Sequence, residues 1–218
     1  EGDLVILIPA TQGGYIKVDI ILSTQPKLKQ SEAATICKLF DSGLERLHMR
    51  KPVHSALEVS CLLDAIPDHF HSNIVMHRHP ELLGDYKLAG YHHSDGEQIQ
   101  KCNGSISKSV HSLSGLADVD SRFDYLFYGP VYKSISKQGY RPKIPLPEVK
   151  EVLLSISQIN NRPKVFALGG IRRKKVIPLS EVGFDGCALL GSVWGHSDPV
   201  KALKRFNQSC LKTLFSPL

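Results

Sequence analysis

The stretch YLFYGPVYKSISK, residues 125–137, is the part of the chain from which its fold can be worked out. Its first four residues are apolar and predict a buried strand, which Gly129-Pro130 ends because proline has no N–H to offer a neighbouring strand. The loop that follows carries two hydroxyls and one ammonium, on Ser134, Ser136 and Lys137. Such donors suit an anion such as phosphate or pyrophosphate, although a solvated loop explains this segment equally well when it is taken alone.

Two glycine turns further along the chain favour the anion-binding interpretation. The apolar run 165–168 leads into Gly169-Gly170, and the run that ends at Leu190 leads into Gly191. Glycine lets backbone N–H groups approach a ligand closely, and helix N-termini attract anions. Glycine turns after consecutive late strands are typical of (β/α)8 barrels, which commonly bind a phosphate there.

Strand-like runs that alternate with helical segments extend this pattern over the whole chain. They lie at 4–8, 44–49, 73–76, 88–91, 105–110, 125–128, 165–168 and 187–190. We expect Leu4–Ile8, which Pro9 ends, to be the first strand, and Ser31 and Ser55 to cap the first two helices. Eight βα units predict an α/β protein in which residues 1–218 form a single (β/α)8 TIM barrel domain, rather than an open doubly wound sheet.

Polar side chains follow nearly every apolar run, at the point where each strand is expected to end. In a parallel barrel these ends lie on one face, which is the face that carries active sites. The sequence therefore predicts an active site formed by the loops after the strands.

Composition limits the classes of partner. The 218 residues are 42% hydrophobic and carry a formal net charge of +6, which suits either a polyanion or phosphorylated small substrates. The chain has no arginine-rich run and no interleaving of basic and aromatic residues, so we expect no nucleic-acid partner. It also has no membrane-length apolar segment, no signal-like start and no CxxC pair, so we expect a cytoplasmic protein that binds no membrane. The oligomeric state stays open, a homodimer included.

With these motifs assembled, the chain resembles the thiamine phosphate synthase/TenI superfamily over nearly its whole length. The segments that match are 47–51, 109–112, 124–137, 167–171 and 186–199. The resemblance implies a barrel enzyme of thiamin biosynthesis. The implied reaction is a transfer that joins hydroxymethylpyrimidine diphosphate to a thiazole phosphate, giving thiamine phosphate and pyrophosphate.

The resemblance also implies roles for individual residues. Ser134, Ser136 and Lys137 would bind the pyrophosphate leaving group, with Ser109 nearby and positive charge from Arg50 and Lys51. The thiazole phosphate would be bound through the backbone N–H groups of Gly169, Gly170, Leu190 and Gly191. Donors aimed at the charge that builds on pyrophosphate would lower the barrier to C–O cleavage.

Two departures from the family pattern stand out, and the first concerns Mg²⁺, the cofactor that the resemblance implies. His77-Arg78-His79 stands where synthases usually carry an Asn-Asp pair, with Arg78 at the position of the acidic metal ligand. His48 replaces a family glutamine. Glu97 and Asp95 follow the fourth strand and are the remaining candidates for acidic ligands. Arg78, with His77 and His48, would then contact the substrate.

Two other functions stay open. In TenI-type thiazole tautomerases, a histidine that matches His111 moves a proton on the thiazole carboxylate phosphate, and that reaction needs no Mg²⁺. A barrel that binds a thiazole or thiamine phosphate without catalysis is the second alternative. A transition-metal site built from His77, His79, His92 and His93 is a further hypothesis, because imidazoles suit zinc.

Overall fold

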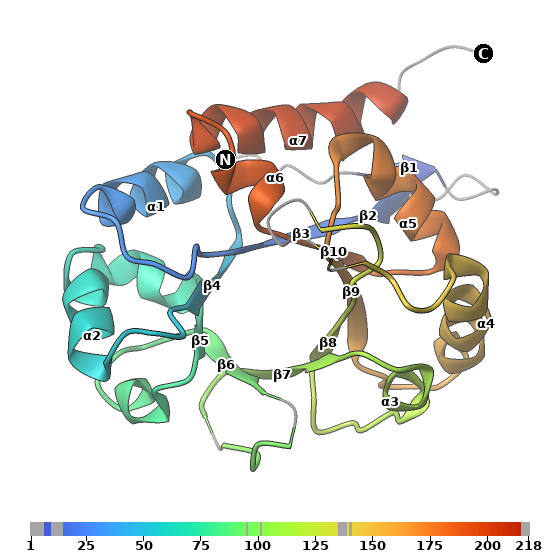
Figure 1. The fold of residues 1–218 in the computed structure, drawn as a ribbon, viewed down its shortest axis with the longest axis horizontal. Coiled ribbons are helices and arrows are strands. Elements are labelled where there is room, and N and C mark those ends of the chain that lie inside the picture. The colour runs from blue at the N-terminus through green and yellow to red at the C-terminus, as the bar shows by residue number, and fades with distance from the viewer. Residues whose placement is uncertain are drawn as a thin grey trace.

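Eight parallel strands form a closed barrel in the computed structural model, which describes residues 7–9, 15–94, 96–100, 102–134, 139 and 141–214 (Figure 1). In chain order the strands are β3 (Asp19–Ser23), β4 (Arg46–Arg50), β5 (Ile74–His77), β6 (Gly90–His93), β7 (Ser105–Val110), β8 (Tyr125–Tyr128), β9 (Lys164–Leu168) and β10 (Gly186–Leu189). Strand β10 closes the barrel on β3, with Gly186 opposite Asp19 and Leu189 opposite Leu22. The predicted (β/α)8 TIM barrel is confirmed.

Helices surround the barrel as an outer ring (Figure 1). They are α1 (Glu32–Asp41), α2 (Ala56–Asp64), α3 (Leu113–Ala117), α4 (Leu146–Ser157), α5 (Val176–Val182), α6 (Gly191–Trp194) and α7 (Pro199–Leu214), with the 3-10 helices η1 (Asp68–Asn73), η2 (Pro80–Leu83) and η3 (Arg173–Lys175). Ser55 caps α2 through a capping box with Glu58, as predicted, whereas the Ser31 side chain makes no capping bond at α1. No helix in the described part of the chain is long and apolar enough to cross a membrane.

The first strand of the barrel is not the one that we expected. Leu7–Pro9 (β1) pairs antiparallel with Tyr15–Lys17 (β2) in a separate two-stranded sheet, and residues 4–6 lie outside the described residues. The barrel position belongs to β3, whose apolar run is short and begins with Asp19. Asp19 is tolerated because its carboxylate lies 2.9 Å from the Lys164 ammonium at the start of β9, where both side chains reach solvent. The prediction for Leu4–Ile8 is therefore wrong.

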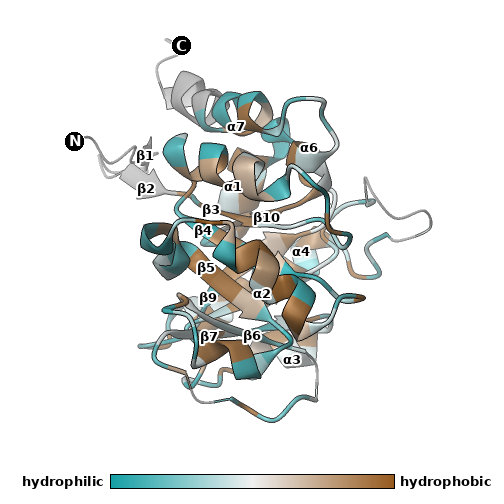
Figure 2. Ribbon diagram, turned by 90° about the vertical axis from the view of Figure 1, so that its left-hand side faces the viewer, coloured by the Kyte–Doolittle hydropathy of each residue, from teal (hydrophilic) through white to brown (hydrophobic). Residues whose placement is uncertain are grey.

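The strand pleat separates two groups of buried residues. Because successive side chains point to opposite faces, one set packs outward against the helices and the other fills the barrel interior. The small apolar cluster comprises Ile21, Tyr125, Phe127, Phe166 and Ala188, which come from β3, β8, β9 and β10. Figure 2 shows the hydrophobic colour on strand β5 and the hydrophilic colour on outer turns of helices such as α1 and α2. The remaining strands, β4 to β7, contribute polar residues to the interior.

Candidate active site

A cluster of three histidines occupies the polar side of the barrel interior. His48 on β4 is fully buried, His92 on β6 is 3% exposed, and His77 ends β5. His48 Nδ1 lies 2.8 Å from His77 Nε2, and the rings of His77 and His92 stack with centroids 4.2 Å apart. Three neighbouring strands therefore place three imidazoles in contact, because each strand contributes a residue of the same pleat.

Hydroxyl groups contact one ring nitrogen of His48 and both ring nitrogens of His92. Tyr125 Oη lies 2.8 Å from His48 Nε2. Ser107 Oγ lies 2.8 Å from His92 Nδ1, and Ser109 Oγ lies 2.9 Å from His92 Nε2. The cluster is thus embedded in hydrogen bonds from β7 and β8, which fix the ring orientations.

All three histidines are held in the neutral form. Burial is the largest cause in each case, and it lowers the pKa of His92 to about 3, with His93 and Arg50 adding to the effect. Burial also lowers the pKa of His48 and that of His77 well below the ordinary value, and the other histidines of the cluster contribute. Near neutral pH the cluster therefore offers imidazole lone pairs and N–H groups without positive charge.

Arg50, expected to add positive charge, lies opposite His77 on the neighbouring strand, and Ser109, expected near the pyrophosphate, contacts His92. Arg50 is the last residue of β4, its side chain is exposed, and it lies close enough to lower the pKa of both His77 and His92. Ser109 is the next-to-last residue of β7. The guanidinium and the hydroxyl thus lie at the carboxyl ends of their strands, the face on which barrel active sites are built.

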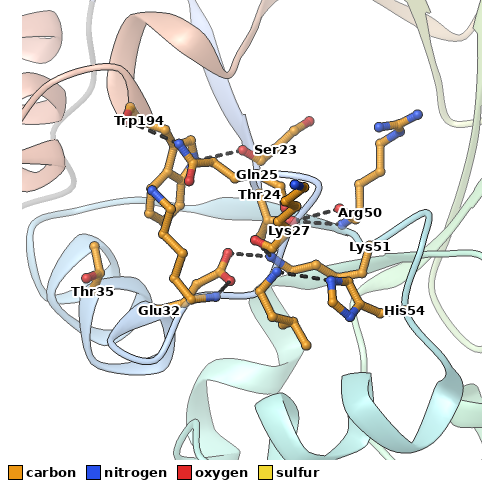
Figure 3. A network of polar contacts seen from close by, with 12 residues as sticks. Ser23, Thr24, Gln25, Lys27, Glu32, Thr35, Arg50, Lys51, His54 and Trp194 are labelled. Carbon is orange, nitrogen blue, oxygen red and sulfur yellow. Dashed lines mark hydrogen bonds and ion pairs between the residues drawn. The ribbon is translucent and has the colours of Figure 1, made fainter.

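Lys51 has a different position from the one that the sequence suggested. Its ammonium is 1% exposed and lies 2.5 Å from Glu32 Oε1 and 2.8 Å from the Gln25 carbonyl. Figure 3 shows Lys51 directed toward Glu32, while the Arg50 side chain extends away from both. Burial lowers the pKa of Lys51, and the bond to Glu32 acts against that shift. Lys51 therefore stabilises the β3–α1 loop. This position does not support its expected contact with substrate.

The loop after β8 lies directly on the end of β9. Val131 N donates to the Leu168 carbonyl at 2.9 Å, and Tyr132 N donates to the Gly169 carbonyl at 3.2 Å. Gly170 has a φ of +67°, and a Cβ added to it would overlap the Lys133 carbonyl oxygen. Only glycine allows so close an approach of two backbones. Ser134 follows Lys133 in this loop, and its role in binding pyrophosphate stays a prediction.

Leu190 and Gly191 continue the same face at the neighbouring strand. β10 pairs with β9, and Leu190 precedes α6, which begins at Gly191. The two glycine turns therefore follow adjacent strands. Ser136 and Lys137, predicted to bind pyrophosphate, lie outside the described residues, as does Asp95.

His111 follows β7 and is anchored by its backbone surroundings. Its Nδ1–H donates to the Gly129 carbonyl at 2.7 Å, because a carbonyl can only accept. That bond assigns the proton to Nδ1 and leaves Nε2 with its lone pair in the neutral ring. His111 can therefore accept a proton at Nε2.

Arg78 and Glu97 lie where the family's acidic metal ligands are expected, and both make other contacts. Arg78 is exposed, has a left-handed φ of 61° and donates to the Pro52 carbonyl at 3.0 Å. Both carboxylate oxygens of Glu97 already accept hydrogen bonds, from Tyr91 Oη at 2.6 Å and from Ser94 N at 2.8 Å. The Tyr91 pKa is raised, first by burial and then by this contact with Glu97.

Comparison with known proteins identifies the family. The model of the family described as "Thiamine monophosphate synthase" matches residues 20–193, which is most of the chain. The chain belongs to this family. The resemblance inferred from the motifs is therefore confirmed.

Curated relatives and solved structures agree with the family assignment. The chain is 24% identical over 163 residues to the thiamine-phosphate synthase of Phocaeicola vulgatus, with 71% of this chain and 78% of the relative covered. It is 27% identical over 142 residues to that of Lactococcus lactis subsp. cremoris, covering 59% of this chain and 63% of the relative. The crystal structure of thiamine phosphate pyrophosphorylase from Bacteroides thetaiotaomicron superposes with a TM-score of 0.74 at 28% identity, with 89% of this chain and 96% of that chain covered.

Among the described residues, which do not include Asp95, the donors brought together do not fit Mg²⁺. In the described part of the chain, the one group of three or more histidine, cysteine or acidic residues able to surround an ion is His48, His77 and His92. Mg²⁺ prefers oxygen ligands, whereas these residues offer nitrogen. Glu97 is the described member of the predicted acidic pair, and its oxygens are engaged.

Two residues of the site, Ser107 and Tyr125, were missed by sequence reasoning. Ser105, Ser107 and Ser109 alternate along β7, as His48 and Arg50 do along β4. Period-two alternation of polar residues in a barrel strand indicates a polar interior face, so this pattern could have located Ser107. Tyr125 gave no such signal, because its run is apolar throughout.

Proposed function

We propose that this protein is a thiamine phosphate synthase, which joins hydroxymethylpyrimidine diphosphate to a thiazole phosphate. The family match over residues 20–193 carries the proposal. The contact between the β8 loop and the Gly169-Gly170 turn supports it, because two segments predicted to bind anions lie side by side there. In the reaction the methylene C–O bond breaks, its electron pair leaves with pyrophosphate, and the thiazole nitrogen forms the new C–N bond.

Each of the predicted site residues would contact a defined part of one of the two substrates. The backbone N–H groups near Gly169, Gly170, Leu190 and Gly191 would bind the thiazole phosphate and orient its ring. Arg50, Ser109 and the hydroxyls of Ser134 and Ser136 would donate to the diphosphate oxygens. The Lys137 ammonium would neutralise the charge that develops as pyrophosphate leaves, which is the largest electrostatic change along the reaction.

Replacing Lys137 by alanine is expected to lower thiamine phosphate formation by roughly 100-fold to 1,000-fold, as removal of one donor to developing charge does elsewhere. The measurement is product formation from hydroxymethylpyrimidine diphosphate and the thiazole phosphate, with Mg²⁺ or with EDTA. Lys143→Ala is the matched control, because Lys143 is an exposed lysine in the segment that precedes α4. Unchanged turnover in Lys137→Ala would remove this residue from the proposed mechanism.

A thiazole tautomerase is the second candidate, and the anchored ring of His111 favours it. The bond from Nδ1 to the Gly129 carbonyl leaves Nε2 able to move a proton. If the protein is a tautomerase, His111→Ala is expected to reduce tautomer interconversion by about 100-fold to 10,000-fold, the usual range for a general acid or base, while binding of the thiazole phosphate persists. Interconversion is followed by the absorbance of the two tautomers in the absence of the pyrimidine substrate.

The two assays together separate the candidates. Thiamine phosphate formation by the wild-type chain supports the synthase. Interconversion without coupling, lost in His111→Ala, supports the tautomerase. Binding of the thiazole phosphate with neither reaction would leave the non-catalytic barrel and contradict both enzyme proposals.

A further inference from the structure

The buried histidine cluster has a donor arrangement that neither proposed reaction explains. One ring nitrogen from each of His48, His77 and His92 lies within 4.8 Å of the others. No carboxylate takes part in this group. Imidazole nitrogens are ligands that zinc and related divalent transition metals bind.

The hydrogen bonds divide the ring nitrogens into an outer and an inner set. Tyr125 Oη contacts the outer nitrogen of His48, Nε2, and Ser107 Oγ contacts the outer nitrogen of His92, Nδ1. A histidine that binds a metal typically donates its second N–H to an oxygen in this way, which fixes both the tautomer and the ring orientation. The inner nitrogens are His48 Nδ1 and His77 Nε2, which share a hydrogen bond at 2.8 Å, and His92 Nε2, which contacts Ser109 Oγ at 2.9 Å. A metal ion would replace both of these contacts.

We propose that these inner nitrogens of His48, His77 and His92 form a binding site for a divalent transition metal such as Zn²⁺. Zn–N bonds of about 2.0–2.1 Å in a tetrahedral site place the nitrogens about 3.3 Å apart. The His48–His77 pair at 2.8 Å must therefore open slightly, while the widest pair, at most 4.8 Å, must close. Ordinary side-chain adjustment supplies both movements, since His77 ends its strand and is partly exposed.

The surrounding charge predicts an anionic fourth ligand. Arg50 lies close to His77 and His92, and Arg46 lies close to His48, so a bare dication would be repelled from both sides. Three neutral histidines leave one tetrahedral position for hydroxide or a phosphate oxygen, which offsets that repulsion. Zn²⁺ binding is therefore expected to tighten when inorganic phosphate is present.

Cobalt titration of the full chain, freed of metal by dialysis against chelator, tests the proposal directly. We expect one equivalent of Co²⁺ to give the visible absorption of a tetrahedral nitrogen site, to be displaced by Zn²⁺, and not to be displaced by excess Mg²⁺. No thiamin substrate is present, so the result is independent of the proposed function. Absence of binding, or near-ultraviolet thiolate charge transfer that indicates cysteine ligands such as the exposed Cys61, would overturn the proposal.

Variants locate the metal within the chain. His48→Gln and His77→Gln are expected to abolish the cobalt spectrum, and Tyr125→Phe to weaken binding about 10-fold to 100-fold through loss of the outer hydrogen bond. His79→Gln is the control, because His79 bonds the His54 carbonyl and Glu81 instead of the cluster. Circular dichroism of each metal-free variant verifies folding. Equal binding by folded His77→Gln, or loss of binding in His79→Gln, would exclude the proposed ligands.

Discussion

Replacing Lys51 by methionine is expected to destabilise the folded chain by about 3–5 kcal/mol, which is the usual loss when one partner of a buried ion pair is removed. Glu32 is 3% exposed, so its carboxylate would remain buried without a counter-charge. The β3–α1 loop would also lose the bond from the ammonium to the Gln25 carbonyl. The measurement is the free energy of unfolding from urea denaturation of the wild type and the variant.

Two further variants give this experiment its controls. The double variant Lys51→Met, Glu32→Leu removes both charges and is expected to recover most of the loss, because no buried charge is left unpaired. Lys164→Met breaks the more exposed pair with Asp19 and should change the free energy of unfolding by about 1 kcal/mol or less. A loss in Lys51→Met no greater than in Lys164→Met would contradict the structural role assigned to Lys51.

Replacing Gly170 by alanine is expected to reduce turnover by roughly 100-fold, the scale of effect that a misplacement of about 1 Å has on a reaction. The new Cβ would overlap the Lys133 carbonyl oxygen and lie 2.8 Å from the Tyr132 carbonyl carbon. Since both are backbone atoms, the β8 loop must move away from the end of β9. Affinity for the thiazole phosphate, measured by calorimetry, should fall together with the activity in the coupling assay.

Gly43→Ala separates this overlap from the cost of the backbone conformation alone. Gly43 has a φ of +87°, and nothing lies within 4 Å of an added Cβ. Alanine there is expected to cost about 1 kcal/mol of stability with unchanged activity. Equal loss of ligand affinity in both variants would show that the packing of the β8 loop against the end of β9 does not determine that affinity.

The strands of the barrel show which structural features a pattern of apolar residues can predict and which it cannot. Seven of the strands were placed from the strand-like runs between 44 and 190, some of which are continuously apolar and others, such as 105–110, alternate apolar and polar residues. Strand β3 was missed because Asp19 interrupts its run, and Leu4–Ile8 offered a longer one. Which run closes the barrel depends on pairing with β10 and β4, a long-range choice that local composition does not contain.

Lys51 illustrates the same limit at the level of a side chain. A basic pair at a strand end predicts two cations at the mouth of the barrel, and Arg50 and Lys51 are adjacent in sequence. The pleat turns adjacent side chains to opposite faces, so one reaches the mouth and the other packs beneath the loop after β3 (Figure 3). The partner that decides the matter, Glu32, lies 19 residues away on α1.

The sequence by itself determined the barrel and the family and predicted the face that bears the candidate site, because periodicity, glycine turns and the order of motifs are local features of the chain. Only the tertiary structure decided that His48, His77 and His92 share one buried space, that Lys51 is internal and that the β8 loop lies on the end of β9. These juxtapositions arise when strands far apart in sequence become neighbours around a closed sheet, and their pleats then select which side chains meet.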